Sequence, residues 1–196
     1  MTFLELICLL AFPSPEHENM RNGLFKQIDN YLEDNNSPHS VHHTMGVVMS
    51  PYFPDILELK AFQKHFKENI KKGTEKDVYL VPDLFIAFDY KREDFCANGY
   101  SKVPKMVIEI VSPSTAGKDY GNKKELYRYI GVEEYWIIND SENVIVNLLE
   151  DGNYQEIEYY LEEMDKDSHK GYLEIEVKVL PGLVIEFSKK KLRLRS

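Results

Sequence analysis

The chain has 196 residues, of which 43% are hydrophobic and 29% are charged, and its formal net charge is −9. This length supports one domain, residues 1–196, with a core of its own, and the composition is ordinary for a soluble protein. The two cysteines, Cys8 and Cys96, make neither a disulfide framework nor a zinc spacing, and they suit a reducing, cytoplasmic compartment. The negative charge argues against tight nonspecific binding to nucleic acid.

The first twelve residues, MTFLELICLLAF, are apolar but include Glu5 and no basic residue. Such a segment is too short to span a bilayer and lacks the basic start of a signal peptide. We therefore expect a strand here and no membrane partner.

A helix is predicted to begin at Ser14-Pro15, because serine is a favoured N-cap and proline is favoured at the first helical position. Apolar residues recur at helical spacing from Met20 to Leu32, and Asn35-Asn36 ends the pattern. The next segments are expected to be a loop at 37–44, a short strand at 47–49, a helix at 55–70 and a turn at 71–74.

The centre of the chain predicts two strands, then a helix and a third strand. The strands at 84–88 and 106–111 are separated by a polar stretch compatible with a hairpin, so they can pair side by side. The helix is expected to have Asp119 as its N-cap and Gly131 as its C-terminal stop, and residues 135–138 form the next strand. This strand–helix–strand crossover indicates a parallel pair.

The C-terminal part predicts antiparallel pairing. Asp151-Gly152 is a favoured hairpin turn, and Pro181-Gly182 is a second turn. Apolar and charged residues alternate between Leu173 and Val179, which indicates a strand with one wet face. The expected segments are strands at 144–149, 154–161, 173–179 and 183–187, an acidic loop at 162–170 and a short, solvated basic tail at 189–196.

Three polar residues stand in the central block where apolar residues would be expected. Glu109 lies within an apolar strand, where a carboxylate is costly unless it is paired or bound to a metal. Lys123 lies on the core-facing stripe of the helix, and Asp83 opens the preceding strand directly behind Pro82. One explanation is a functional site, and the structural alternative is a buried Glu109–Lys123 ion pair with Asp83 merely ending a strand.

The order of these residues resembles the PD-(D/E)xK nuclease superfamily and, within it, the Uma-type family of restriction-endonuclease-like proteins. The matching text is VPDLFIAFD, PKMVIEIVSPST, then Asp119, Lys123 and Tyr127 at a spacing of four, and GVEEYWIIND. The usual superfamily lysine, two residues after the glutamate, is replaced by Val111; the family commonly moves it to the next helix, where Lys123 fits. The resemblance implies an α/β fold: a restriction-endonuclease-like mixed sheet core flanked by helices, with additional antiparallel hairpins.

The resemblance also implies a metal-dependent DNA endonuclease, acting as a homodimer so that both strands can be cut. Asp83, Glu109 and the main-chain carbonyl of Ile110 would hold Mg²⁺ or Mn²⁺, and Lys123 would assist the attacking water. Tyr127 could form a hydrogen bond within the site, although a core aromatic is the more ordinary role. We expect both carboxylates to face a surface cleft.

The sequence leaves the accessory residues open. Many superfamily members carry an acidic residue on or near the first helix, for which Glu16 and Glu18 are candidates and Glu5 a weaker one. His17 either faces the site or lies on the surface at the helix end. His42-His43 has the residue type of a metal ligand but no third partner at useful spacing, so it is predicted to be part of a loop.

Positive charge gathers near the proposed site. From Lys102 to Arg128 there are six basic residues against three acidic ones, so the remainder of the chain carries the negative excess. Two alternatives to the endonuclease follow. One is a catalytically inactive nuclease-fold protein with a DNA-binding or regulatory role; the negative net charge favours this alternative. The other is a phosphoesterase acting on RNA or nucleotides.

Overall fold

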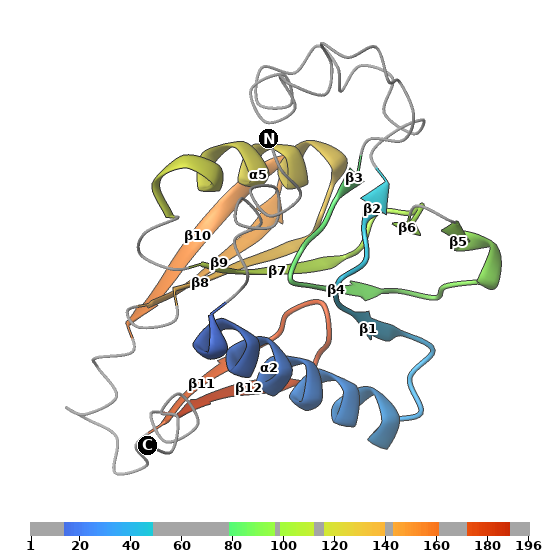
Figure 1. Ribbon diagram of the computed structural model, residues 1–196, viewed down its shortest axis with the longest axis horizontal. Helices are drawn as coiled ribbons and strands as arrows, with labels where there is room; N and C mark the ends of the chain where they lie inside the picture. The colour runs from blue at the N-terminus through green and yellow to red at the C-terminus, as the bar shows by residue number, and fades with distance from the viewer. Residues whose placement is uncertain are drawn as a thin grey trace, which may run out of the picture.

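The computed structural model describes residues 14–48, 79–96, 99–111, 116–139, 143–160 and 172–188. Within these ranges the chain forms the α-helices α2 (Pro15–Asp34) and α5 (Ala116–Ile130) and the 3₁₀-helix η2 (Arg92–Asp94), together with three β-sheets (Figure 1). Several predictions lie outside the described residues: the first strand, the helix at 55–70, the turn at 71–74, the acidic loop and the basic tail.

The main sheet has six strands in the order β1-β4-β7-β8-β9-β10. β7 and β8 run parallel, joined by α5, while the other neighbours are antiparallel, so the sheet is mixed as predicted. The strands are β1 (Ser40–His42), β4 (Leu84–Ala87), β7 (Met106–Val111), β8 (Glu134–Asn139), β9 (Asn143–Glu150) and β10 (Asn153–Tyr160).

Two smaller sheets complete the described fold. One has the order β3-β2-β6-β5, and the other is the antiparallel hairpin of β11 and β12. The strands are β2 (Val47–Val48), β3 (Tyr79–Leu80), β5 (Phe95–Cys96), β6 (Gly99–Tyr100), β11 (Tyr172–Glu176) and β12 (Val184–Ser188). The α/β class, the helix-flanked mixed sheet and the additional antiparallel hairpins are therefore confirmed.

The two helices pack on opposite faces of the main sheet, with α2 and the β11–β12 hairpin on one side and α5 on the other (Figure 1). Because side chains alternate along a strand, Ile108 of β7 joins the core under α2, whereas Val107 joins the core under α5. Glu109 comes next in this alternation and so faces α5. The side chains that α5 directs at the sheet decide what surrounds this carboxylate.

Helix α2 begins as the sequence predicts. The side chain of Ser14 accepts the His17 N–H at 3.2 Å, and Pro15 occupies the first helical position. The helix ends at Asn35, and Asn36 adopts a left-handed conformation with φ of 48°. The Ser14 cap fixes the first turn of α2, which lies beside the start of β4.

Helix α5 begins earlier than predicted. Its first residue is Ala116, so Asp119 lies inside the helix and its prediction as the N-cap is wrong. The apolar stripe that located the helix starts only at Tyr120, and the turn before it has no such pattern in the sequence. The end of the helix is confirmed, because Gly131 takes φ of 89° and the Val132 N–H donates to the Tyr127 carbonyl at 3.0 Å.

The predicted loop at 37–44 is wrong in its middle, where β1 pairs antiparallel with β4. A three-residue edge strand with a single buried side chain, Val41, is too short to show alternation in the sequence. The hairpin at Asp151-Gly152 is confirmed by β9–β10. The wet-faced strand is confirmed up to Glu176, with buried Ile175 between exposed glutamates, whereas the predicted residues 177–179 lie beyond the end of β11. None of the described helices is long and apolar enough to cross a membrane.

Candidate active site

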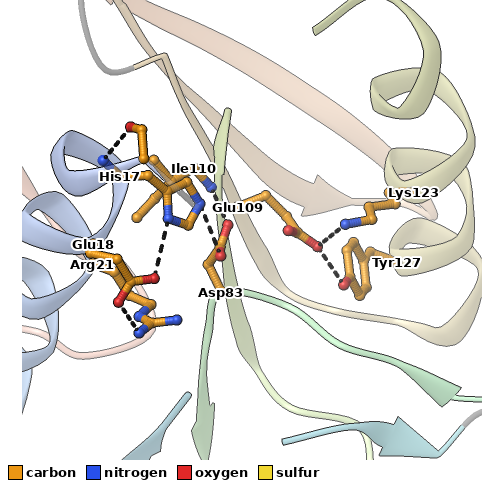
Figure 2. Close-up of polar contacts among 9 residues, drawn as sticks. His17, Glu18, Arg21, Asp83, Glu109, Ile110, Lys123 and Tyr127 are labelled. Atoms are coloured by element: carbon orange, nitrogen blue, oxygen red, sulfur yellow. Dashed lines mark hydrogen bonds and ion pairs between the residues drawn. The ribbon is translucent and has the colours of Figure 1, made fainter. Parts of the chain in front are cut away.

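Glu109, Lys123 and Tyr127 form one contact group between β7 and α5. The Lys123 ammonium nitrogen lies 3.0 Å from Oε1 of Glu109, and the Tyr127 hydroxyl donates to the same oxygen at 2.9 Å. Figure 2 shows both side chains of α5 pointing at the carboxylate. The predicted stripe of α5 is thus confirmed as facing the sheet, and Tyr127 serves both as a core aromatic and as a hydrogen-bond donor.

Burial has the largest effect on the pKa of Glu109, because this residue is only 4% exposed. The loss of solvent raises the pKa of the Glu109 carboxyl group; Lys123 opposes this rise, and the nearby Asp83 carboxylate adds to it. Burial and the Glu109 charge raise the pKa of Tyr127 well above its usual value, so its hydroxyl stays protonated and can donate. The expectation that both carboxylates face a surface cleft is wrong for Glu109, because this residue is buried and contacts Tyr127 and Lys123.

Asp83 lies at the bend immediately before β4 and contacts two different elements. Its Oδ2 accepts the backbone N–H of Ile110 at 2.7 Å, and its Oδ1 lies 3.1 Å from Nε2 of His17 on α2 (Figure 2). The antiparallel register, with Leu84 opposite Ile108, brings the residue before β4 alongside the last residues of β7. Asp83 and Glu109 therefore come from neighbouring strand positions, as predicted, and the Asp83 carboxylate contributes to the raised pKa of Glu109.

The polar residues of the first turn of α2 differ in their exposure and in their contacts. Glu16 is exposed, whereas Glu18 forms an ion pair with Arg21 and lies 3.9 Å from Nδ1 of His17. It is His17 that reaches Asp83, and this hydrogen bond raises the pKa of the imidazole against the opposing effect of burial. His17, and neither Glu16 nor Glu18, is therefore the residue of this turn that contacts Asp83. The weaker candidate, Glu5, lies outside the described part of the chain.

Arg21 was not identified from the sequence. Its guanidinium pairs with Glu18, and its Nε is buried with no hydrogen-bond partner in the described part of the chain. A signal was available, since Arg21 lies four residues after His17 and therefore on the same side of a helix. An arginine on a predicted core-facing stripe requires an acidic partner, and helical spacing offers Glu18.

His42 and His43 are not part of this contact group. His42 belongs to β1, stacks on Phe85 with ring centroids 5.2 Å apart, and forms a 2.7 Å hydrogen bond with Ser40. Burial lowers the pKa of His42, which favours the neutral ring. His43 is exposed and meets the edge of the Phe25 ring. Both therefore have packing roles, although His42 is a strand residue rather than the predicted loop residue.

The carboxylates of Asp83 and Glu109 suit a metal ion that keeps part of its water shell. Across the described ranges, no three histidine, cysteine, aspartate or glutamate side chains converge into a ready-made cage. Mg²⁺ does not require such a cage, because it keeps several waters and commonly binds one or two carboxylates together with substrate phosphates. The two carboxylates of Asp83 and Glu109 suit Mg²⁺ in number and in ligand type, and they do not suit a zinc site.

The fold has a counterpart among solved structures. The chain is similar to the crystal structure described as a putative nuclease belonging to DUF820 from Anabaena variabilis ATCC 29413, with a TM-score of 0.60. The sequence identity is 13%, and the match covers 92% of this chain and 82% of the other. At this identity the likeness concerns the fold. No curated protein matches the chain.

The sequence itself matches a family model. The model named Uma2, described as putative restriction endonuclease, aligns with residues 6–188, which include α2, Asp83, Glu109 and α5. Since the match extends over nearly the whole chain, it agrees with the resemblance noted in the central block. The protein therefore belongs to the Uma2 family of putative restriction endonucleases.

Proposed function

We propose that the protein is a metal-dependent endonuclease that hydrolyses phosphodiester bonds in DNA. The observation that carries the proposal is that Asp83, directly before β4, and Glu109 of the adjacent strand β7 are neighbours across the sheet, with the Lys123 amine on Glu109. Membership of the Uma2 family, with its description as putative restriction endonuclease, supports nuclease activity. The metal, the site residues and DNA as substrate are our inference.

Asp83, Glu109 and the main-chain carbonyl of Ile110 would hold the divalent ion, Mg²⁺ or Mn²⁺. Such an ion supplies Lewis acidity at the scissile phosphate and makes a bound water more nucleophilic. The raised pKa of Glu109 suits this role, because a buried carboxylate next to a second acid gains from a cation.

Lys123 provides the chain's own positive charge at the site. With 23% of its side chain exposed, it can leave or share Glu109 to orient the attacking water and to offset charge that develops on the phosphate. Tyr127 keeps Glu109 in place through its hydroxyl while its ring packs 4.9 Å from the Tyr135 ring, centroid to centroid. Each residue then has a separate task that substitution can test.

The experiment is a supercoiled-plasmid assay in which Mg²⁺ or Mn²⁺ is titrated. The wild type should nick the plasmid, and Asp83→Ala, Glu109→Ala and Lys123→Ala should each lose about 100-fold or more of the rate. Lys124→Ala is the matched control, because the neighbouring lysine pairs with Glu156 at 2.5 Å rather than with Glu109. Circular dichroism must show that every variant is folded.

A second candidate is a nuclease-fold protein that binds DNA or regulates without cutting. It is favoured by the Glu109–Lys123 contact, in which acid and amine already neutralise each other, and by the net charge of −9. Wild-type protein that shifts DNA in a gel but leaves the plasmid intact at every metal concentration would establish this candidate. Cleavage of RNA or nucleotides without cleavage of duplex DNA would instead indicate a phosphoesterase.

Cutting both strands of a duplex requires two sites, and we propose a homodimer that acts in the cytoplasm. The free, exposed Cys96 is compatible with a reducing compartment. A linear product that appears together with the nicked form, and a dimeric mass by light scattering, are the expected results. A monomer that only nicks would exclude the dimer without affecting the assignment of the site.

A further inference from the structure

The carboxyl group of Asp83 is held from two sides by different parts of the fold. The Ile110 N–H of β7 donates to Oδ2 at 2.7 Å, and Nε2 of His17 on α2 lies 3.1 Å from Oδ1 (Figure 2). Within the described ranges, each carboxylate oxygen thus has one donor. An aspartate has about four lone-pair sites on its two oxygens, so two donors leave room for further ligands.

His17 is itself fixed at both its backbone and its ring. Its N–H donates to Ser14 at the helix start, and its ring is largely buried, with 17% of the side chain exposed. Because an ionised carboxylate only accepts hydrogen bonds, Nε2 must carry the proton that points at Asp83. The other ring nitrogen, Nδ1, is buried and has no hydrogen-bond partner among the residues that the structure describes; Glu18 lies 3.9 Å from it.

This arrangement is costly unless the ring has a task. A buried polar atom without a hydrogen-bond partner destabilises the folded state, and among the described residues Nδ1 has none. Leucine or another apolar residue at this position of α2 would avoid that cost. What histidine adds is the donor Nε2 at the right distance from Asp83.

We infer that His17 is a positioning residue that holds the Asp83 carboxyl group against β7, ready to bind a divalent cation. The metal-binding half of this inference rests on the proposed function. Aspartate has two rotatable side-chain bonds, and a donor on each oxygen restricts both. Such supporting hydrogen bonds are commonly worth about 10-fold to 100-fold in metal affinity or activity.

The first half of the test uses metal-free protein and needs no activity. Hydrogen exchange of the Ile110 amide reports whether Asp83 stays in place, because this N–H donates to the Asp83 side chain. His17→Ala should make this exchange about tenfold faster or more. His17→Gln, whose side-chain amide can present a donor at a similar reach, should retain most of the protection.

Two controls show whether the change in exchange at Ile110 is local. The Val177 amide, which donates to Leu183 at 2.9 Å in the β11–β12 hairpin, should exchange at an unchanged rate and so exclude a global loss of stability. Glu16→Ala changes the exposed neighbour of His17 in the same helical turn and should leave the Ile110 amide unaffected. Unchanged exchange at Ile110 in His17→Ala would overturn the inference.

The second half measures Mn²⁺ binding by calorimetry. His17→Ala should weaken the affinity about 10-fold to 100-fold, and His17→Gln should restore it to within a few-fold of the wild type. If the wild type binds Mn²⁺ and His17→Ala binds it equally well, the inference is wrong. If the wild type binds no Mn²⁺, the proposed metal chemistry fails, and exchange at Ile110 alone decides whether His17 holds Asp83.

Discussion

The ammonium nitrogen of Lys123 and the carboxylate of Glu109 are 3.0 Å apart, and the oxygen in this contact, Oε1, is also the one that accepts the Tyr127 hydroxyl. The other oxygen, Oε2, takes part in neither contact. Lys123 and Tyr127 lie four residues apart on one side of α5, so a single helix face supplies both donors. The position of α5 therefore determines both the charge balance and the orientation of Glu109.

Tyr127→Phe should lower both stability and nicking. The ring would still pack against Tyr135, but Glu109 would lose a buried donor, and a hydrogen bond to a charged group is worth about 1.5–3 kcal/mol. We expect the nicking rate to fall about tenfold or more, because Glu109 is less well oriented. Urea unfolding and the plasmid assay measure the two effects separately.

Tyr154→Phe is the matched control for this prediction. Its hydroxyl donates to the Val132 carbonyl at 3.0 Å, away from the Glu109 contact group. It should destabilise the fold by about 1 kcal/mol and leave the nicking rate of the folded protein unchanged. If both variants lose activity in proportion to their loss of stability, Tyr127 has no role beyond packing.

The pKa of Glu109 predicts an unusual pH dependence of stability in the metal-free protein. The folded pKa lies above the usual 4.5, mainly because of burial. Between these two values the folded chain binds more protons than the unfolded chain, so the free energy of unfolding falls as the pH rises. Above the folded pKa the full penalty of the buried charge is present.

Glu109→Gln should therefore raise the Tm at about pH 8 while it abolishes nicking, and the difference from the wild type should shrink towards about pH 4. Lys123 would lose its contact with a charged Glu109, but its side chain is 23% exposed and can be solvated. Glu125→Gln gives the opposite sign, since Arg128 lowers the pKa of Glu125 and its charge is favourable. A lower Tm for Glu109→Gln at high pH would mean that the ion pair outweighs the burial cost.

Local patterns were sufficient to place Glu109 and Lys123 opposite each other. Alternation along β7 assigns Glu109 to one face, and helical spacing assigns Lys123 to the side of α5 that packs there. The contact between His17 and Asp83 could not be obtained in this way. It depends on how α2 lies across the ends of β4 and β7, which no repeat in the sequence specifies.

Two glycines with different surroundings predict opposite effects of alanine. Gly23 is exposed within α2 with open space around it, so Gly23→Ala should stabilise the protein. The expected gain is about 1 kcal/mol, or about 2–4 °C in Tm. Gly99 has φ of +134°, and an added Cβ would lie 2.0 Å from the Gly46 carbonyl oxygen, which accepts the Tyr100 N–H.

Gly99→Ala should therefore destabilise the protein by about 1–3 kcal/mol or more, through backbone strain and a forced separation of β2 and β6. Thermal unfolding of both variants, followed by circular dichroism, gives the sign and the size of each effect. A Gly99→Ala protein as stable as the wild type would show that these two short strands contribute little to the stability of the fold.

Glu134 shows where the sequence is ambiguous. The pair Glu133-Glu134 precedes a buried strand, and the sequence pattern does not indicate which of the two glutamates is buried. In the structure Glu134 is fully buried at the start of β8. Its Oε1 accepts the Trp136 indole N–H at 2.7 Å, and its Oε2 accepts the Val179 N–H at 2.9 Å. This carboxylate links the main sheet to the turn that joins β11 and β12.

Glu134→Gln should destabilise the protein by about 1–3 kcal/mol, because an amide offers one acceptor oxygen where the carboxylate offers two, and one buried N–H loses its partner. Glu133→Gln is the adjacent control: its side chain is 50% exposed and pairs with Lys105 at the surface, so we expect a change within about 0.5 kcal/mol. Urea unfolding at neutral pH measures both, with an unchanged m-value as the sign of an intact transition. Equal effects of the two substitutions would show that the Glu134 link does not stabilise the hairpin. Only at the buried Glu134 does a lost hydrogen bond leave an N–H donor that water cannot reach.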